Sequence, residues 1–337
     1  SLDIATYYMS NYTCEYARAL VERGMEGGYQ FLDALAGVDA CSMMNRAMEH
    51  FEILQMNDKP NFFVSHCDIP YKVTDYTLDS YVKQMRRRVL EPLAEKYGVD
   101  TSDAAIRKAV AEHNEVCAII SEIGEMRKAD NPVITGYEFH VLNLVSFTCP
   151  KQLILPYLRE TLEELKTRKP DAKPAFRARV AIVGSEIDDP NLTKLIESCG
   201  ALVVSDRYCF GSTPGREIIH LRDDEDALPQ ICLHIMEHSE CARYISDEKV
   251  QQRRDTADRL ARAFHADGII YEQMKYCDYW GFERALVSHI MHEEYNWPVL
   301  SIDRLYNNGN SGQLRTRVQA FVESLEIKKL HKNGGAN

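Results

Sequence analysis

Helical spacing of apolar residues dominates the first half of the chain. It predicts helices over residues 5–30, 43–54, 137–148 and 151–167, and two long helices within 76–128. Two short apolar segments, 35–40 and 61–66, interrupt the early helices and are expected to be buried strands. The first half therefore combines a small amount of sheet with long helices.

The pattern changes after residue 176 to short apolar runs that alternate with helices. The expected strands are 180–183, 202–204, 268–271 and 299–302, and the expected helices are 191–198, 227–238, 248–264, 283–294 and 312–326. Alternation of this kind predicts a parallel sheet with helices on both faces and right-handed crossovers. We expect a flavodoxin-like domain with strand order 2-1-3-4.

The expected fold class is therefore α/β, with two small flavodoxin-like parallel α/β domains joined by a helical segment. The predicted boundaries are an N-terminal domain over 1–75, a helical connector over 76–176 and a C-terminal domain over 177–330. Residues 166–173, which include Pro170, are the best candidate for a linker.

Composition excludes several classes of protein. The chain has 337 residues, 45% of them hydrophobic and 27% charged, as in ordinary globular proteins. A net charge of −11 gives no indication of a nucleic-acid partner. No apolar run approaches the ~20 residues of a membrane span, and residues 1–5 lack the features of a signal peptide. A cytoplasmic location is expected. The first residue is not Met, so we expect a chain that is trimmed or incomplete at its start.

Ten cysteines are unusual in a chain without an export signal. Disulfides are not expected in a reducing compartment, and no CxxC pair is present. Zinc ribbons and bacterial ferredoxin motifs are therefore absent. If these thiols bind metal, ligands that are distant in sequence must meet in space.

Cys277 and Cys41 each lie where a predicted strand gives way to a predicted helix. Ligands bind at this edge of a parallel α/β sheet, and a helix N-terminus favours the thiolate form that binds metal. A buried, chemically inert cysteine is the alternative for each residue taken alone.

Two glycine-containing segments are possible anion sites. The run 183–186 lacks the GxGxxG pattern, and Asp188 and Asp189 follow it, so a dinucleotide site is rejected. The run 309–317 opens the last helix and is equally consistent with an anion site and with a simple loop.

Four motifs in order resemble one known family. They are Tyr12-Thr13-Cys14-Glu15-Tyr16-Ala17-Arg18, Val38-Asp39-Ala40-Cys41, Lys275-Tyr276-Cys277-Asp278 and the run from Gly312 to Phe321. Together they resemble subunits of the 2-hydroxyacyl-CoA dehydratase / benzoyl-CoA reductase family, over nearly the whole chain. Family members usually carry more chain before the first cysteine, so residues of that segment cannot be assigned here.

The resemblance implies that Cys14, Cys41 and Cys277 hold one [4Fe–4S] cluster in the crevice between the two α/β domains. Three thiolates leave one iron open to water or to a substrate oxygen, unlike a cluster with four cysteine ligands. Catalytic residues remain unknown.

The resemblance also implies a CoA-thioester substrate and one-electron chemistry through a ketyl radical. The implied partners are a homologous second subunit, an ATP-hydrolysing iron–sulfur activator and an upstream ferredoxin or flavodoxin, so that ATP acts only through the activator. Neither nucleic acid nor a membrane is an expected partner.

Weaker candidates flank the cluster cysteines. Tyr16, Arg18, Ser42 and Asn45 are candidates to hydrogen-bond cluster sulfurs or the thioester. Trp280 is a candidate to line an aromatic pocket, and Arg315 and Arg317 are candidates to meet a CoA phosphate. Cys209 and Cys241 are candidates for additional ligation, because some relatives hold a larger cluster. Core or structural roles are favoured for Cys67, Cys117, Cys199 and Cys232, and Cys149 has no assigned role.

The resemblance leaves the reaction open. Ile69-Pro70-Tyr71 and the aromatic residues beside Cys277 favour, slightly, ATP-dependent ring reduction of the benzoyl-CoA type. The alternatives are a 2-hydroxyacyl-CoA dehydratase subunit that uses the same cluster, a non-catalytic electron-relay subunit of either enzyme, and a metal-free α/β binding protein.

Overall fold

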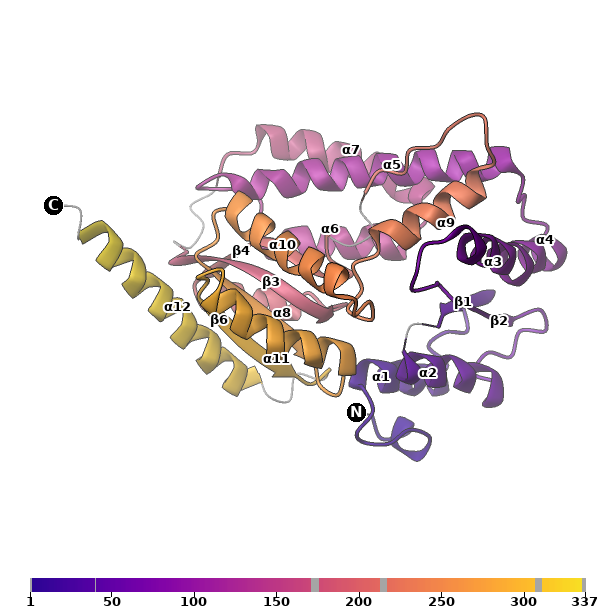
Figure 1. Cartoon of the computed structure of the whole chain (residues 1–337), viewed down its shortest axis with the longest axis horizontal. Coiled ribbons are helices and arrows are strands. Elements are labelled where there is room, and N and C mark those ends of the chain that lie inside the picture. The colour runs from indigo at the N-terminus through magenta and orange to yellow at the C-terminus, as the bar shows by residue number, and fades with distance from the viewer. Residues whose placement is uncertain (1, 40, 171–175, 213–216, 307–310, 335–337) are drawn as a thin grey trace. The chain divides into compact units, whose positions relative to one another are not determined.

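The computed structural model describes residues 2–39, 41–170, 176–212, 217–306 and 311–334 (Figure 1). The described chain forms two compact units. The first comprises residues up to 111 together with 219–244, and the second comprises 112–218 together with the residues from 245 onward. The predicted α/β class is confirmed. The division into three segments stays a prediction. Residues of the expected connector 76–176 belong to both units.

The first unit contains a small parallel sheet. Strands β1 (Ala34–Val38) and β2 (Phe63–Cys67) pair in parallel, with Val38 opposite Cys67. Its helical elements are η1 (Ala5–Tyr7), α1 (Glu15–Met25), α2 (Ser42–Ile53), α3 (Asp75–Met85), the π-helical turn η2 (Arg86–Leu90), α4 (Glu91–Tyr97) and α9 (Ala227–His238). The helix expected over 5–30 is thus shorter and begins only after Cys14.

The second unit contains a four-stranded parallel sheet of order β4-β3-β5-β6. Its strands are β3 (Ala178–Glu186), β4 (Ala201–Cys209), β5 (Gly268–Met274) and β6 (Val299–Arg304). Because β3 is the first of these in sequence, the order confirms the predicted 2-1-3-4 arrangement. Buried residues occupy nearly every position of β3 and β4, as expected for parallel strands covered on both faces.

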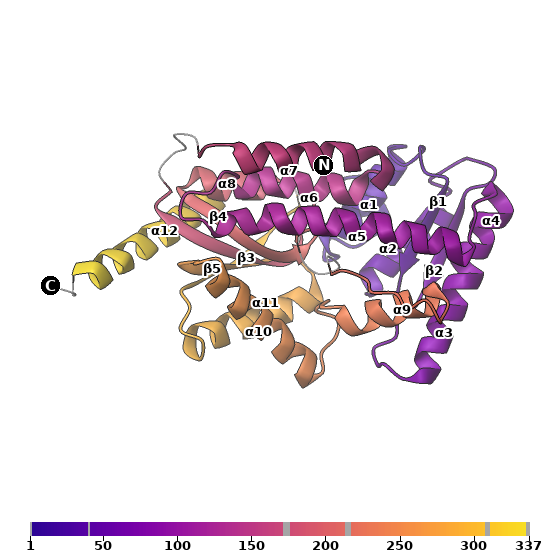
Figure 2. The ribbon, with the colours of Figure 1, turned by 90° about the horizontal axis from the view of Figure 1, so that it is seen from above.

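Helices cover both faces of this second sheet (Figure 2). The helices α8 (Asn191–Ser198) and α12 (Ser311–Gly334) pack on one face, and α10 (Asp247–Ala263) and α11 (Asp278–Glu293) on the other. The main apolar core lies between the sheet and the α8–α12 layer, and includes Val180, Ile182 and Val322. The layered arrangement follows from the alternating pattern of the sequence.

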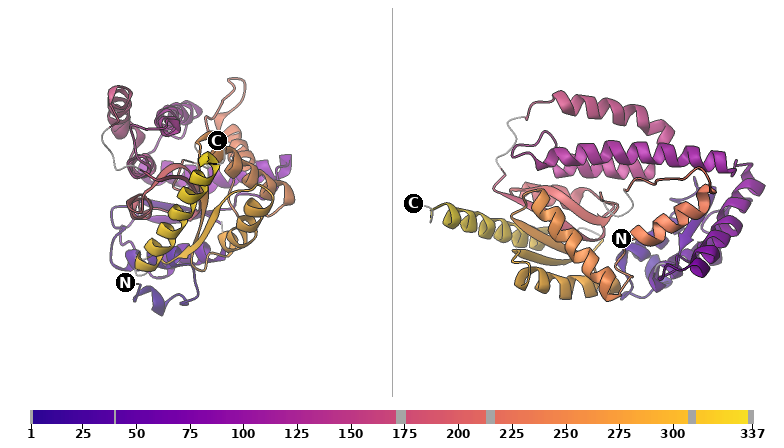
Figure 3. Two further views of the ribbon diagram at one scale, coloured as in Figure 1. Left: turned by 90° about the vertical axis from the view of Figure 1, so that its left-hand side faces the viewer. Right: turned by 45° about the horizontal axis from the view of Figure 1, so that its top comes forward.

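Among the described residues, four helical elements come directly before the second sheet in chain order. They are α6 (Gly136–Thr148), α7 (Lys151–Thr167), the short turn η3 (Met126–Lys128) and α5 (Asp103–Glu125), which begins in the first unit. Helices α5 and α7 run side by side (Figure 3) and share an apolar core that includes Ile123 and Leu158. A capping box between Thr135 and Glu138 starts α6.

The described residues leave out parts of the predicted segments. These parts are residue 40 of the segment 35–40 and of the motif 38–41, residues 171–173 of the linker, and residues 309–310 of the 309–317 run. Among the described residues, no helix has the length and apolar character that crossing a membrane requires.

A buried ion pair joins α10 to α11. Arg253 Nε donates to Glu283 Oε1 at 2.6 Å, and both side chains are 3% exposed. We predict that Glu283→Gln lowers the free energy of unfolding by about 3–5 kcal/mol, because it leaves a buried guanidinium without its counter-charge.

Urea denaturation of the Glu283→Gln variant measures this loss. Asp79→Asn is the matched control, since it breaks the exposed Asp79–Lys83 pair, and exposed pairs contribute less than about 1 kcal/mol. Equal losses in the two variants would contradict the assignment of Arg253 and Glu283 as a buried pair.

Candidate functional site

Each of the three predicted ligand cysteines occupies the N-cap of a helix. Cys14 precedes α1, Cys41 precedes α2 and Cys277 precedes α11. The backbone N–H groups of a first helical turn have no partner within the helix and favour a negative charge at this position. The helix after Cys277 begins at Asp278, five residues earlier than the sequence pattern indicated, so this thiol is also adjacent to its helix.

The first unit brings the turns of Cys14 and Cys41 together. The backbone N–H of Cys14 donates to the Met43 sulfur at 3.1 Å, and Met43 lies in the first turn of α2. The Cys41 sulfur accepts the backbone N–H of Met44 at 3.4 Å. Cys14 is buried and Cys41 half-buried. Two thiols thus lie at neighbouring helix N-termini.

Buried polar atoms without a protein partner lie one turn beyond both cysteines. They are Arg18 Nε on α1 and Asn45 Oδ1 on α2, within the part of the chain that the structure describes. The backbone of Arg18 bonds to the Cys14 carbonyl, and that of Asn45 to the Cys41 carbonyl. Unsatisfied polar atoms are rare in protein interiors and mark a place where a bound group is expected. Arg18 Nε is a donor of the kind that cluster sulfurs accept, whereas Asn45 Oδ1 is an acceptor and does not add to the fit.

Two successive side-chain hydrogen bonds hold the turn that carries Cys277 in the second unit. Gln273 Nε2 donates to the Cys277 carbonyl at 3.0 Å, and Arg284 Nε donates to Gln273 Oε1 at 2.7 Å. Tyr276 adopts a left-handed backbone with φ of 67°, which is uncommon for a residue with a side chain. Strain of this kind persists where surrounding contacts fix the turn.

Charged side chains collect at the carboxyl ends of β3, β5 and β6 in the same unit. Glu272 is fully buried, accepts hydrogen bonds from Ser185 N and Oγ, and forms an ion pair of 2.6 Å with Arg304. The Ser185 hydroxyl also accepts the N–H of Met274, three residues before Cys277. This network links the end of β3 to the turn of Cys277.

Glu186 lies at the end of β3. Its Oε2 atom has no hydrogen-bond partner in the described part of the chain. The pKa of Glu186 is raised to about 7, chiefly by burial. The carboxylates of Glu272 and Asp188 also raise this pKa, whereas a backbone hydrogen bond and the Arg304 guanidinium lower it. This carboxyl therefore changes protonation near neutral pH. No feature of the sequence pattern singled it out.

The weaker candidates are dispersed. Tyr16 and Ser42 lie in the first turns of α1 and α2, directly after the cysteines. Trp280 is buried, 6.0 Å from the Arg207 guanidinium. Arg315 donates to the Ser198 hydroxyl and Arg317 to the Ser301 carbonyl, so both are engaged within the protein. Contacts with a cluster or with CoA stay predictions for all five.

The remaining cysteines differ in how deeply they are buried. Cys67, Cys117, Cys199 and Cys232 are buried, and burial raises the pKa of the Cys67, Cys199 and Cys232 thiols. Core or structural roles are consistent with this. Cys209, at the end of β4, and Cys241 are half-buried. Additional ligation by these two stays a prediction.

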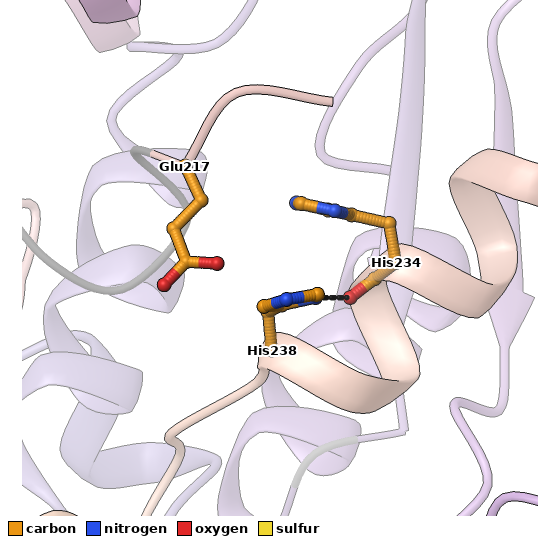
Figure 4. A group of neighbouring side chains, drawn as sticks. All are labelled: Glu217, His234 and His238. Atoms are coloured by element: carbon orange, nitrogen blue, oxygen red, sulfur yellow. Dashed lines mark hydrogen bonds between the residues drawn. The ribbon is translucent and has the colours of Figure 1, made fainter. Parts of the chain in front are cut away.

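One further pair of possible metal ligands was not predicted. His234 and His238 lie on α9 with their rings stacked, the ring centres 4.3 Å apart (Figure 4). His238 Nδ1 lies 3.0 Å from the His234 carbonyl one helical turn earlier. The His-x-x-x-His spacing on α9 is the signal in the sequence that could have found it.

Comparison with known proteins identifies the family. The profile of "2-hydroxyglutaryl-CoA dehydratase, D-component" matches residues 1–325. The chain belongs to this family. It is 23% identical over 308 residues to YjiM of Escherichia coli (strain K12), which is named as a dehydratase subunit, covering 88% of this chain and 75% of the relative.

A second relative is the beta subunit of (R)-2-hydroxyglutaryl-CoA dehydratase from Acidaminococcus fermentans. Identity is 21% over 331 residues, covering 94% of this chain and 82% of that subunit. The resemblance inferred from the cysteine motifs is thus confirmed. The matches support the dehydratase alternative and give no specific support to the ring reduction that we had favoured.

The pKa of Glu186 leads to a prediction of pH dependence. A carboxyl with a pKa raised in the folded state binds its proton more tightly there than in the unfolded chain. We expect its contribution to the free energy of unfolding to fall by up to about 3 kcal/mol as pH rises from 4.5 to about 7.

Glu186→Gln removes this contribution, so stability should depend less on pH in the variant over that window. Urea denaturation at pH 5 and pH 8 measures the difference between the two proteins. Parallel pH profiles for the wild type and the variant would show that Glu186 titrates normally.

Proposed function

We propose that this chain is a subunit of a 2-hydroxyacyl-CoA dehydratase, a lyase that removes water from a 2-hydroxyacyl-CoA thioester. Membership of the dehydratase family over residues 1–325 carries the proposal. The N-cap placement of Cys14, Cys41 and Cys277 supports it, because a helix N-terminus favours the thiolate form that binds metal. Ring reduction of the benzoyl-CoA type is the less favoured reading.

In this proposal Cys14, Cys41 and Cys277 hold one [4Fe–4S] cluster. When bound, the cluster supplies an electron of low potential to the thioester. Three thiolate ligands leave one iron accessible to a further ligand. The protein contributes the orientation of the ligands, through the Met43 contact with Cys14 and the Gln273 contact with Cys277.

The proposed assembly contains a homologous second subunit, since one relative is named as the beta subunit of such an enzyme. An ATP-hydrolysing iron–sulfur activator, reduced by ferredoxin or flavodoxin, is proposed to deliver the electron. We place the enzyme in the cytoplasm, where thiols remain reduced.

The test of the ligand set is anaerobic iron and sulfide analysis with EPR spectroscopy. We predict about four irons per wild-type chain and a lost or altered signal in Cys277→Ser, because an alcohol is a poor replacement for a thiolate ligand. Cys149→Ser is the matched control, since Cys149 is also half-buried and lies at a helix end. It should keep the wild-type iron content and spectrum.

The reaction is tested with the purified assembly and its activator. (R)-2-hydroxyacyl-CoA thioesters should be converted to enoyl-CoA products, and benzoyl-CoA should remain unchanged. Iron-free wild-type protein, or an unchanged spectrum in Cys277→Ser, would contradict the cluster assignment. Turnover of benzoyl-CoA alone would favour the ring-reducing alternative.

A further inference from the structure

Arg243 is a buried cation of the first unit, and no carboxylate of the described residues forms an ion pair with it. Its side chain is 3% exposed. Among the described residues, its hydrogen-bond acceptors are the carbonyl oxygens of Asp39 and Ile69, at 3.0 and 2.8 Å, and the Tyr244 hydroxyl at 2.8 Å. All three acceptors are neutral. Buried charges in proteins are normally paired with an opposite charge, because desolvation is costly.

Aromatic rings supply the rest of the surroundings. The Arg243 guanidinium lies 4.9 Å from the Tyr71 ring centre and 4.7 Å from that of Tyr244. The two rings meet edge to face at 5.5 Å. Cation–π contacts of this kind stabilise a guanidinium partially and do not neutralise it. The protein thus retains a localised positive charge inside the first unit.

The position of this charge is set by the two strand ends. Asp39 follows β1 and lies two residues before Cys41, and Ile69 follows β2. One planar guanidinium therefore bonds to the segments that leave both strands. A guanidinium suits this task because its donors diverge in fixed directions, whereas an ammonium is a single point. The contact with Asp39 is made two residues before the Cys41 thiol.

We propose that Arg243 is a positioning residue that fixes the Cys41 turn and provides the positive charge for the thiolate-bound cluster. The inference rests on the proposed function for the cluster, and it adds a residue that the ligand set does not include. A positive charge near a cluster favours its reduced, more negative form. Hydrogen bonds and charges around the ligands are known to set cluster potentials.

The experiment compares three variants in the reconstituted protein under anaerobic conditions. Arg243→Gln removes the charge. Arg243→Lys keeps the charge but replaces the planar guanidinium, with its diverging donors, by a single ammonium group. Arg46→Gln is the matched control, because Arg46 lies on α2 five residues after Cys41, is 56% exposed and pairs with Glu49 at the surface. Redox titration followed by EPR measures the midpoint potential and the signal shape of the cluster.

We expect Arg243→Gln to shift the reduction equilibrium at least tenfold towards the oxidised cluster, which is about 59 mV for one electron. Arg243→Lys should recover most of that potential while altering the EPR signal, because one ammonium cannot hold both carbonyls. Arg46→Gln should match the wild type in potential and in signal.

Tyr244→Phe provides a milder variant if Arg243→Gln does not fold. It removes one acceptor from the guanidinium without a change of charge, and we expect an altered EPR signal at an unchanged potential. An unchanged signal in Tyr244→Phe, or a potential in Arg243→Gln equal to that of Arg46→Gln, would overturn the inference and leave the cluster in place. Wild-type protein without iron would instead overturn the proposed function and the inference with it.

Discussion

A thiolate inside a protein needs donors and positive charge around it, and this requirement connects the main features of the structure. Helix N-termini provide both at Cys14, Cys41 and Cys277. At Cys41 the contact is direct, since the sulfur accepts the backbone N–H of Met44. A simple packing role would not require the same capping position at three cysteines that are so distant in sequence.

The turns that carry these cysteines are fixed by polar side chains from neighbouring segments. Gln273 and Arg284 hold the Cys277 turn, and Arg243 holds the segment before Cys41. Each arrangement uses a buried or half-buried group that costs free energy to desolvate. Proteins retain such desolvated polar groups at sites where the position of a side chain matters more than the stability of the fold.

The second sheet concentrates titratable groups at one edge. Glu186, Glu272 and Arg304 come from three adjacent parallel strands, and parallel strands direct their carboxyl ends to the same side. Burial at that edge keeps Glu186 protonated at a higher pH than a surface carboxyl, because burial disfavours its charge. The second unit therefore carries a group able to exchange a proton near neutrality, next to the strand that leads to Cys277.

Patterns in the sequence predicted the α/β class and the strand-to-turn placement of Cys41 and Cys277, whereas the 2-1-3-4 strand order was a default expectation that the structure confirmed. Hydrophobic periodicity is local, so the apolar runs of β3 to β6 reveal their own secondary structure. Tertiary structure alone decided which polar side chains surround the turns. Arg243 is 204 residues from Asp39, and Ser185 is 87 residues from Glu272. Neither pairing leaves a local pattern, because contacts between distant segments depend on how the elements pack. The cysteine motifs left the reaction open, and the family match supports the dehydratase alternative over ring reduction.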